Sequence, residues 1–207
     1  MIKSIMTNTG VVFSERKEDS ETAFDMFGRL NQALVCGSFP AATVTAAYDT
    51  DNIGIGPDLK PQPGNKSGGL DWRVAKITDD GLFDFLRLGL PGPTETAASY
   101  LSFWIWSPRP LDNLLVEPNM PKLDLLMGSD DGCQVWLNSK LIKEDRGTHP
   151  VVADSIICDA LPLQRGWNHL VVKVVQGSGQ WQYEARLQSS IPEFLEEIKS
   201  SASSPQE

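Results

Sequence analysis

Short runs of alternating apolar and polar residues fill most of the chain beyond residue 70. Such runs, rich in aromatic and β-branched residues and bounded by turn-forming residues, are typical of β-strands. The predicted strands are Trp72–Ile77, Tyr100–Trp106, Lys122–Met127, Cys133–Asn138, Leu141–Lys143, Ser155–Ala160, His169–Gln176 and Trp181–Leu187. In the last of them every second residue is apolar, so these side chains should share one buried face.

The segments between these strands carry turn signals. Gly128–Gly132 places two aspartates between glycines, Asn138–Lys140 predicts a tight hairpin turn, and Gly177–Gly179 predicts a further turn. Short strands separated by such turns predict an all-β fold, either a sandwich or a barrel. The chain shows no alternation of strands and helices, which argues against a Rossmann-type sheet.

Both ends of the chain carry a helical pattern. In Glu15–Asn31, apolar residues recur at Phe24, Phe27 and Leu30, a spacing that indicates a short amphipathic helix. Ile191–Ile198 has apolar residues three and four positions apart and predicts a short helix near the C-terminus.

These patterns divide the chain into three parts. We expect an N-terminal extension with a short helix at 1–31, a β-sandwich domain at 32–190, and a C-terminal helix with a frayed tail at 191–207. Within the domain, residues 49–69 are rich in glycine and proline and have no periodicity. This segment therefore predicts a long loop, which is either functional or mobile.

The composition limits the partners. The chain has 207 residues and a net charge of −9, which argues against nucleic acid as the main partner. No apolar run reaches the roughly 18 residues that a membrane span needs, and no secretory signal is visible at the N-terminus. We expect no membrane partner and a cytoplasmic location, or an extracellular one if the sequence is trimmed from an exported chain.

The cysteines and histidines do not predict a metal or catalytic centre. Cys36, Cys133 and Cys158 lie in apolar stretches without the spacing of a zinc site, so buried thiols are expected. His149 and His169 have no nucleophile or acid beside them in the sequence. No phosphate-binding glycine loop is present either, so no nucleotide cofactor is expected.

Two stretches resemble a known family of modules. They read LLMGSDDGCQVWLNSKLI at residues 125–142 and LPLQRGWNHLVVKVVQGSGQWQYEARL at residues 161–187. Both are similar to the galactose-binding-like, PA14-like jelly-roll modules of bacterial polysaccharide-active proteins. The resemblance implies a jelly-roll β-sandwich of two antiparallel sheets, which we expect to carry the short helices at both ends. It also implies a carbohydrate-binding function.

Four aspartates are candidate calcium ligands. The resemblance implies that Asp130 and Asp131 could hold Ca²⁺, as adjacent aspartates do in some PA14-like lectins. Asp49 and Asp51 stand at the head of the long loop, where two carboxylates could converge on the same ion. The alternative is that all four are turn-forming or solvated loop residues.

Five aromatic residues are candidate ligand contacts. If their strand neighbours face the core, Trp104, Trp106 and Trp136 point outward and could stack on sugar rings. Trp181 lies beside the Gly177–Gly179 turn and could rim a pocket, and Tyr48 precedes the candidate metal ligand Asp49. The alternative is that the N-terminal helix and the long loop bury this second face of the sheet.

Three functions are open at this point, and the resemblance favours the first. It is a non-catalytic module that binds a carbohydrate or another small molecule by aromatic stacking, with calcium as a candidate cofactor. The second is a small cyclase-type or isomerase-type enzyme, in which an acid such as Asp124 or Glu184 protonates a hydrophobic natural product inside an aromatic pocket. The third is a protein-interaction subunit that docks through its aromatic face.

Overall fold

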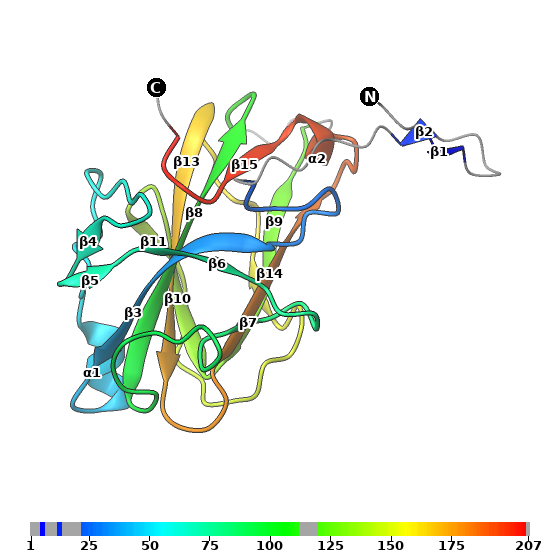
Figure 1. Cartoon of the computed structure of the whole chain (residues 1–207). Coiled ribbons are helices and arrows are strands. Elements are labelled where there is room, and N and C mark those ends of the chain that lie inside the picture. Colours follow the sequence, from blue (N-terminus) through cyan, green and yellow to red (C-terminus); the bar gives the residue numbers. More distant parts are fainter. Residues whose placement is uncertain (1–4, 7–11, 14–21, 112–119, 206–207) are drawn as a thin grey trace.

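The computed structural model describes residues 5–6, 12–13, 22–111 and 120–205, and it confirms an all-β sandwich of antiparallel sheets (Figure 1). The large sheet contains, in spatial order, β11 (Lys140–Asp145), β10 (Gly132–Leu137), β13 (Gly166–Gln176), β8 (Ala97–Ser107), β3 (Gln32–Pro40) and β6 (Arg73–Lys76), with β15 (Lys199–Ser201) also beside β8. The small sheet contains β12 (Ile156–Cys158), β9 (Leu123–Asp130), β14 (Gln182–Ser189) and β7 (Phe83–Asp84). The remaining elements are the pairs β1 (Ile5–Met6) with β2 (Val12–Phe13) and β4 (Lys66–Ser67) with β5 (Leu70–Asp71), and the helices α1 (Val44–Asp49) and α2 (Phe194–Glu197).

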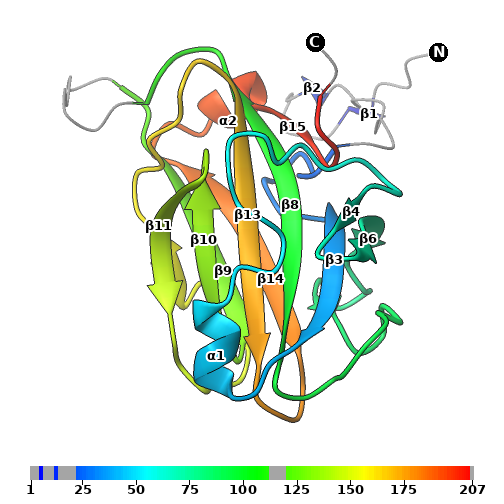
Figure 2. The same cartoon turned by 90° about the vertical axis from the view of Figure 1, so that its left-hand side faces the viewer.

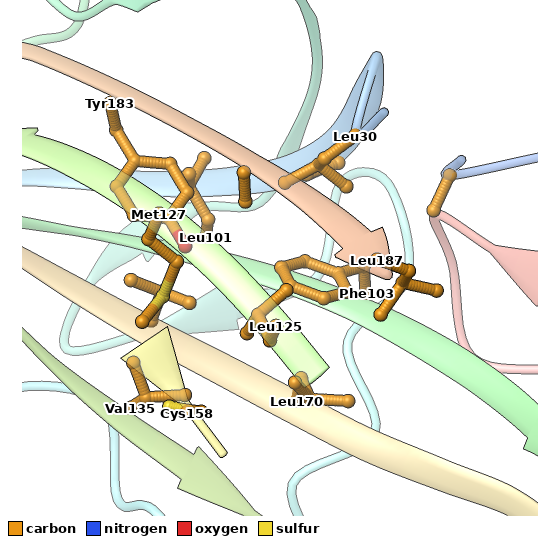
Figure 3. Packing of buried hydrophobic residues seen from close by; sticks show 14 of the residues in the cluster. Leu30, Leu101, Phe103, Leu125, Met127, Val135, Cys158, Leu170, Tyr183 and Leu187 are labelled. Atoms are coloured by element: carbon orange, nitrogen blue, oxygen red, sulfur yellow. The ribbon is translucent and has the colours of Figure 1, made fainter. Parts of the chain in front are cut away.

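The main core lies between the two sheets (Figure 3). Alternate residues of β8 and β13, such as Phe103 and Leu170, meet alternate residues of β9 and β14, such as Leu125 and Leu187. The apolar face predicted for the last strand is confirmed, because every second side chain from Trp181 to Leu187 is buried. Each large apolar side chain buried here stabilises the fold by about 1.5–3 kcal/mol. The three cysteines are buried free thiols, as expected.

The turn predicted at Gly128–Gly132 is wrong for most of the segment, which lies in β9 and β10. Ser129 and Asp130 continue β9 and pair with β14, whereas Gly132 begins β10 in the other sheet. The motif therefore carries the chain from the small sheet to the large one. Glycine is needed at position 132, since a Cβ there would lie 2.2 Å from the Tyr48 hydroxyl. The predicted hairpin turn at Asn138 and Ser139 is confirmed, and both residues adopt the left-handed conformation that such turns require.

The prediction of a helix at 15–31 is wrong for residues 22–31. From residue 22 onward the chain forms a tight turn closed by a bridge between Phe24 and Leu30. The Asp25 carboxylate accepts hydrogen bonds from the backbone N–H groups of Phe27 and Arg29, which favours this turn over a helix. Residues 14–21 lie outside the described part of the chain.

The C-terminal end is more ordered than expected. Only Phe194–Glu197 is helical, and the expected frayed tail instead forms β15, which pairs with Trp104–Trp106 of β8. The Ser204 N–H then donates to the carbonyl of Pro61 at 3.2 Å, so this tail is tied to the long loop. Residues 206–207 lie outside the described part. Neither of the two described helices is long and apolar enough to cross a membrane.

The outer face of the large sheet is also covered, and a helix that the sequence pattern did not reveal contributes to the cover. Thr43 is the N-cap of helix α1, and its hydroxyl accepts a hydrogen bond from the Ala46 N–H at 3.1 Å. The chain after α1 crosses the outer surface of β13 and β8 (Figure 2), where Ile53 packs with Tyr100 in a second apolar cluster. The large sheet is therefore buried on both faces along its central strands.

Lys173 joins this cover to the sheet. Its side chain starts on β13 and is only 2% exposed, and its Nζ donates to the carbonyl oxygens of Tyr48 and Thr50 at 2.8 Å each. Both carbonyls lie at the C-terminal end of α1, where a helix leaves its last carbonyls without partners. Burial lowers the pKa of Lys173 to about 8. A single buried side chain thus caps the helix from the sheet below.

We expect replacement of Lys173 to destabilise the protein. Lys173→Met keeps the apolar stem but leaves the Tyr48 and Thr50 carbonyls without this donor, and a buried unpaired polar group costs about 1–3 kcal/mol. The free energy of unfolding in urea should fall by about 2–4 kcal/mol. Lys140→Met, at the exposed start of β11, is the matched control and should change it by less than about 0.5 kcal/mol. Equal stability of Lys173→Met and the unmodified protein would contradict this role.

Candidate ligand-binding site

A shallow depression lies at the free edge of the large sheet, beside β6. Its volume is about 240 Å³, and it is open to solvent on one side. The lining residues are Gly69, Leu70 and Asp71 of the β4–β5 hairpin, Arg73 of β6, and Gly89 and Pro91 of the segment between β7 and β8. We refer to this set of six residues as the depression.

One wall of the depression is held by Cys36 of β3 and by Trp72, which follows β5. The buried Cys36 Sγ lies 3.7 Å from the carbonyl of Ser67 and 3.6 Å from that of Leu70, toward which it donates its proton. Burial raises the pKa of Cys36 to about 11, so it stays a thiol. The indole Nε1 of the buried Trp72 donates to the Ser67 hydroxyl at 2.9 Å. The β4–β5 hairpin is therefore held in place by buried contacts.

The opposite wall rests on the same strand. The Ser38 N–H donates to the carbonyl of Pro91 at 2.8 Å, and the Ser38 hydroxyl donates to the carbonyl of Pro93 at 2.5 Å. Gly92 approaches closely here, since a Cβ at that position would lie 2.5 Å from the Ser38 carbonyl oxygen. Neighbouring residues of β3 thus fix both walls.

The depression brings together a carboxylate and a guanidinium. Asp71 is exposed and forms a 3.5 Å ion pair with Lys66, which is also exposed. Arg73 lies on the same side of β6 as Ala75 of the main core, and its Nη2 donates to the Gly89 carbonyl at 3.3 Å across the depression. A carboxylate accepts hydrogen bonds and a guanidinium donates them, so the site can bind hydroxyl groups.

Sequence reasoning missed Asp71 and Arg73. A signal was available, because Gly68 and Gly69 precede an alternating run of Leu, Asp, Trp and Arg. The second wall, at Gly89 and Pro91, has no such signal, since it reaches the depression only through its contact with β3.

The predicted aromatic contacts lie elsewhere and do not form one open face. Trp104 is 8% exposed and stacks on His169, with ring centres 4.2 Å apart. Trp106 and Trp136 are half-buried, and the Lys199 Nζ lies 4.8 Å from the centre of the Trp106 ring. Trp181 lies in the main core at 1% exposure, so it does not rim a pocket. The second face of the sheet is largely buried, although α1 and the C-terminal tail contribute to the cover instead of an N-terminal helix.

His169, which stacks on Trp104, also contacts a serine, and the sequence did not reveal this contact. Ser102 of β8 and His169 of β13 lie on neighbouring strands, and the Ser102 Oγ is 2.7 Å from the His169 Nε2. Ser102 is fully buried, and burial lowers the pKa of His169 to about 3. The imidazole is therefore neutral at physiological pH, and the serine hydroxyl has no access to a substrate.

The structure brings Tyr48 and two of the four predicted calcium ligands to one corner. Arg146 pairs with the Asp49 carboxylate at 2.8 Å, and its guanidinium lies 5.1 Å from the centre of the Tyr48 ring. The Asp131 carboxylate accepts a hydrogen bond from the Gly177 N–H at 2.6 Å. Burial raises the pKa of Tyr48, and the nearby charge of Asp131 contributes to this rise.

The remaining two predicted ligands have separate surroundings. Asp130 is buried at the end of β9, and this burial raises the pKa of its carboxyl group. Asp51 accepts hydrogen bonds from the N–H groups of Ile53, Gly54 and Ile55. Within the described ranges, no group of three or more His, Cys, Asp or Glu side chains is arranged to hold a metal ion. Among the described residues, the carboxylates of Asp49, Asp51 and Asp131 each have a partner within the protein.

The two acids considered for catalysis are engaged in backbone hydrogen bonds. The Asp124 Oδ1 accepts from the Ala160 N–H at 2.7 Å, and the Glu184 Oε1 accepts from the Asp154 N–H at 3.2 Å. Burial raises the pKa of Glu184. Both lie on the side of the small sheet that faces away from the main core, not inside an aromatic cavity.

Comparisons with known proteins find remote similarity to solved structures. No protein-family model matches the sequence, and no curated protein matches it either. Among solved structures, the PA14 domain of the antifreeze protein MpAFP is 12% identical over 93% of this chain and 98% of that domain, with a TM-score of 0.43. A family 2 glycosyl hydrolase from Bacteroides cellulosilyticus is 11% identical (TM-score 0.42), and a β-glycosidase from Bacteroides vulgatus is 13% identical (TM-score 0.37).

The two glycosidases are much longer than this chain. The match covers 77% of this chain but only 20% of each glycosidase, so the chain spans about a fifth of their length. The sheets of the described residues are those of the expected antiparallel β-sandwich. At these identities and TM-scores the similarity does not extend to the function, which has to be argued from the site.

We expect His169 to make the protein sensitive to acid. Its pKa is lowered from 6.5 to about 3, so between these values the unfolded chain binds a proton that the folded chain does not. This contribution to stability is complete above pH 6.5 and is lost as the pH falls toward 3. Thermal unfolding of His169→Gln should show a shallower pH dependence in this range than the unmodified protein. His149→Gln, in a partly exposed loop, is the control, and identical slopes for His169→Gln and the unmodified protein would refute the assignment.

We expect calcium to leave the stability unchanged. Asp51 is occupied by three backbone N–H groups, Asp49 by Arg146 and Asp131 by Gly177, so the carboxylates lack the convergence that six to eight oxygen ligands require. The melting temperature should be the same after EDTA treatment and in excess Ca²⁺. A rise with Ca²⁺ that Asp130→Asn abolishes would show that the aspartate pair binds the ion after all.

Proposed function

We propose that this chain is a non-catalytic module that binds carbohydrate in the depression at the edge of the large sheet. The observation that carries the proposal is the chemistry of that depression: the acidic Asp71 and the basic Arg73 line a shallow space together with Gly69 and Gly89. Its volume of about 240 Å³ is below the roughly 300–1,000 Å³ of pockets that enclose drug-sized ligands. The occupant is therefore a small polar group, such as one sugar unit at the end or side of a longer chain.

The lining suits sugar hydroxyls in particular. Neighbouring hydroxyls of a sugar can donate to the Asp71 carboxylate and accept from the Arg73 guanidinium. Hydrogen bonds to such charged groups are worth about 1.5–3 kcal/mol each, more than those between neutral groups. At Gly69 and Gly89 no other atom lies within 4 Å of the position that a Cβ would take, so a ligand can approach the backbone there.

Binding without catalysis is favoured by the state of the reactive groups. Ser102 and His169 are buried, and Asp124 and Glu184 are held by backbone N–H groups on the outside of the small sheet. A general acid has to reach the atom that it protonates, and none of these groups faces the depression. The enzyme hypothesis therefore finds no support in their placement.

Aromatic stacking belongs to this proposal as a secondary contact. Trp106 and Trp136 are the two predicted aromatic contacts that keep part of their surface exposed, and neither lines the depression. A longer sugar chain could extend from the depression toward one of them. We propose that the depression supplies the primary contact and that calcium is not required.

The proposal predicts a defined pattern of binding among variants. Thermal unfolding against a panel of oligosaccharides should reveal at least one that raises the melting temperature, because a ligand at a hundredfold excess over Kd stabilises by about 2.7 kcal/mol. Arg73→Ala and Asp71→Asn should weaken that binding by on the order of tenfold, as expected for loss of a charged hydrogen bond. Lys76 lies three residues after Arg73, on the opposite side of β6. Lys76→Ala is therefore the matched control and should bind normally.

The same experiment separates the two kinds of contact. If Trp106→Ala or Trp136→Ala abolishes binding while Arg73→Ala does not, the ligand binds at the outer face and the depression is not the site. Failure of every oligosaccharide to bind would exclude the carbohydrate function.

A further inference from the structure

The region around the depression differs in charge from the rest of the protein. Residues 58–76, which include the β4–β5 hairpin and β6, contain four basic and two acidic residues and have a net charge of +2. The whole chain has a net charge of −9. Of these residues Asp71 and Arg73 line the depression and Lys66 pairs with Asp71, so the charged groups at the candidate site carry a positive excess that favours an acidic group on the ligand.

Arg73 has most of its hydrogen-bonding capacity available. A guanidinium carries five N–H donors, and within the described part of the chain Arg73 donates a single 3.3 Å hydrogen bond, to the Gly89 carbonyl. Across the described residues Arg73 forms no ion pair, unlike Arg87 and Arg109, which pair with acidic neighbours. Its charge inside the depression is therefore not neutralised by the protein.

Asp71 is balanced by a different residue. The 3.5 Å contact with Lys66 joins two exposed side chains, and such pairs are worth only about 0–1 kcal/mol. Lys66 nevertheless offsets the negative charge of Asp71, so an acidic ligand meets the unbalanced charge of Arg73. Asp71 remains free to accept hydrogen bonds from hydroxyl groups of the same ligand.

We infer that the depression selects a carboxylated sugar, a uronic acid unit, whose carboxylate pairs with Arg73. This inference rests on the proposed carbohydrate function and names the class of sugar. The planar fork of a guanidinium matches a carboxylate with two parallel hydrogen bonds, a geometry that the hydroxyl of a neutral sugar cannot reproduce. The hydroxyls of the same ring then donate to Asp71.

The overall negative charge does not prevent this recognition. At physiological ionic strength the Debye length is about 8 Å, so acidic residues farther away are largely screened, whereas a directly contacting Arg73 is not. The local charge of the depression therefore decides the preference. At 1 M salt, where the Debye length is about 3 Å, the advantage of the acidic sugar should shrink.

The test compares acidic and neutral ligands of equal length. We would measure Kd for an oligosaccharide of galacturonic acid, for its methyl ester and for the corresponding galactose oligosaccharide, with the unmodified protein. The acidic ligand should bind on the order of tenfold more tightly than either neutral one. Arg73→Ala should remove this difference, and Arg73→Lys should restore only part of it, because an ammonium keeps the charge but lacks the fork.

A matched charge removal serves as the control. Lys76→Ala removes one positive charge from the same strand, on the side away from Arg73, and should leave the preference for the acidic ligand intact. If Lys76→Ala and Arg73→Ala lose this preference equally, the preference comes from general electrostatic attraction and the inference is overturned.

The remaining outcomes separate this inference from the function on which it rests. If the neutral and acidic oligosaccharides bind equally, the carbohydrate function stands and the selection of a carboxylated sugar is wrong. If none of the three ligands and no other oligosaccharide binds, both are wrong.

Discussion

Burial of the central strands on both faces is the constraint on which the rest of the structure depends. In β8 and β13 almost every residue is buried, on the side of the main core and on the opposite side alike. The small sheet covers one face, so the other needs a cover of its own. That cover consists of α1 and the long loop, and Lys173 of β13 binds the carbonyls at the end of α1. Most aromatic side chains of this face are buried in packing contacts, so the proposed ligand site lies at the edge of the sheet instead.

Strand β3 holds both walls of the depression in place. Cys36 contacts the hairpin on one side of the depression, and Ser38 binds the carbonyls of Pro91 and Pro93 on the other. Two walls that are far apart in the sequence are thus fixed by residues two positions apart on one strand. Because buried groups hold both walls, little conformational freedom is lost when a ligand binds.

The sequence allowed the strands to be predicted better than their surroundings. Alternation in segments such as Trp181–Leu187 reports burial directly, because the period of two decides which side chains face the core. Helix α1 has only six residues and depends on Lys173, which is more than a hundred positions away, so no local pattern could reveal it. The two aspartates of Gly128–Gly132 resemble a turn locally, yet Asp130 pairs with β14 and the chain changes sheets after it.

The candidate site could not be predicted from the sequence pattern for a related reason. It is formed by polar groups, and their contacts do not follow the period of a strand. Asp71 and Arg73 flank the buried Trp72, whose indole is fixed by Ser67, so the strand that buries the tryptophan also exposes its two charged neighbours. Because the site is shallow, its affinity must come from a few charged hydrogen bonds rather than from buried area. A site of this kind discriminates through pairing, since a ligand that lacks the matching group leaves a charge without a partner. In the proposed carbohydrate site, selectivity therefore follows from the charges of these two side chains, while the β-sandwich fixes their positions.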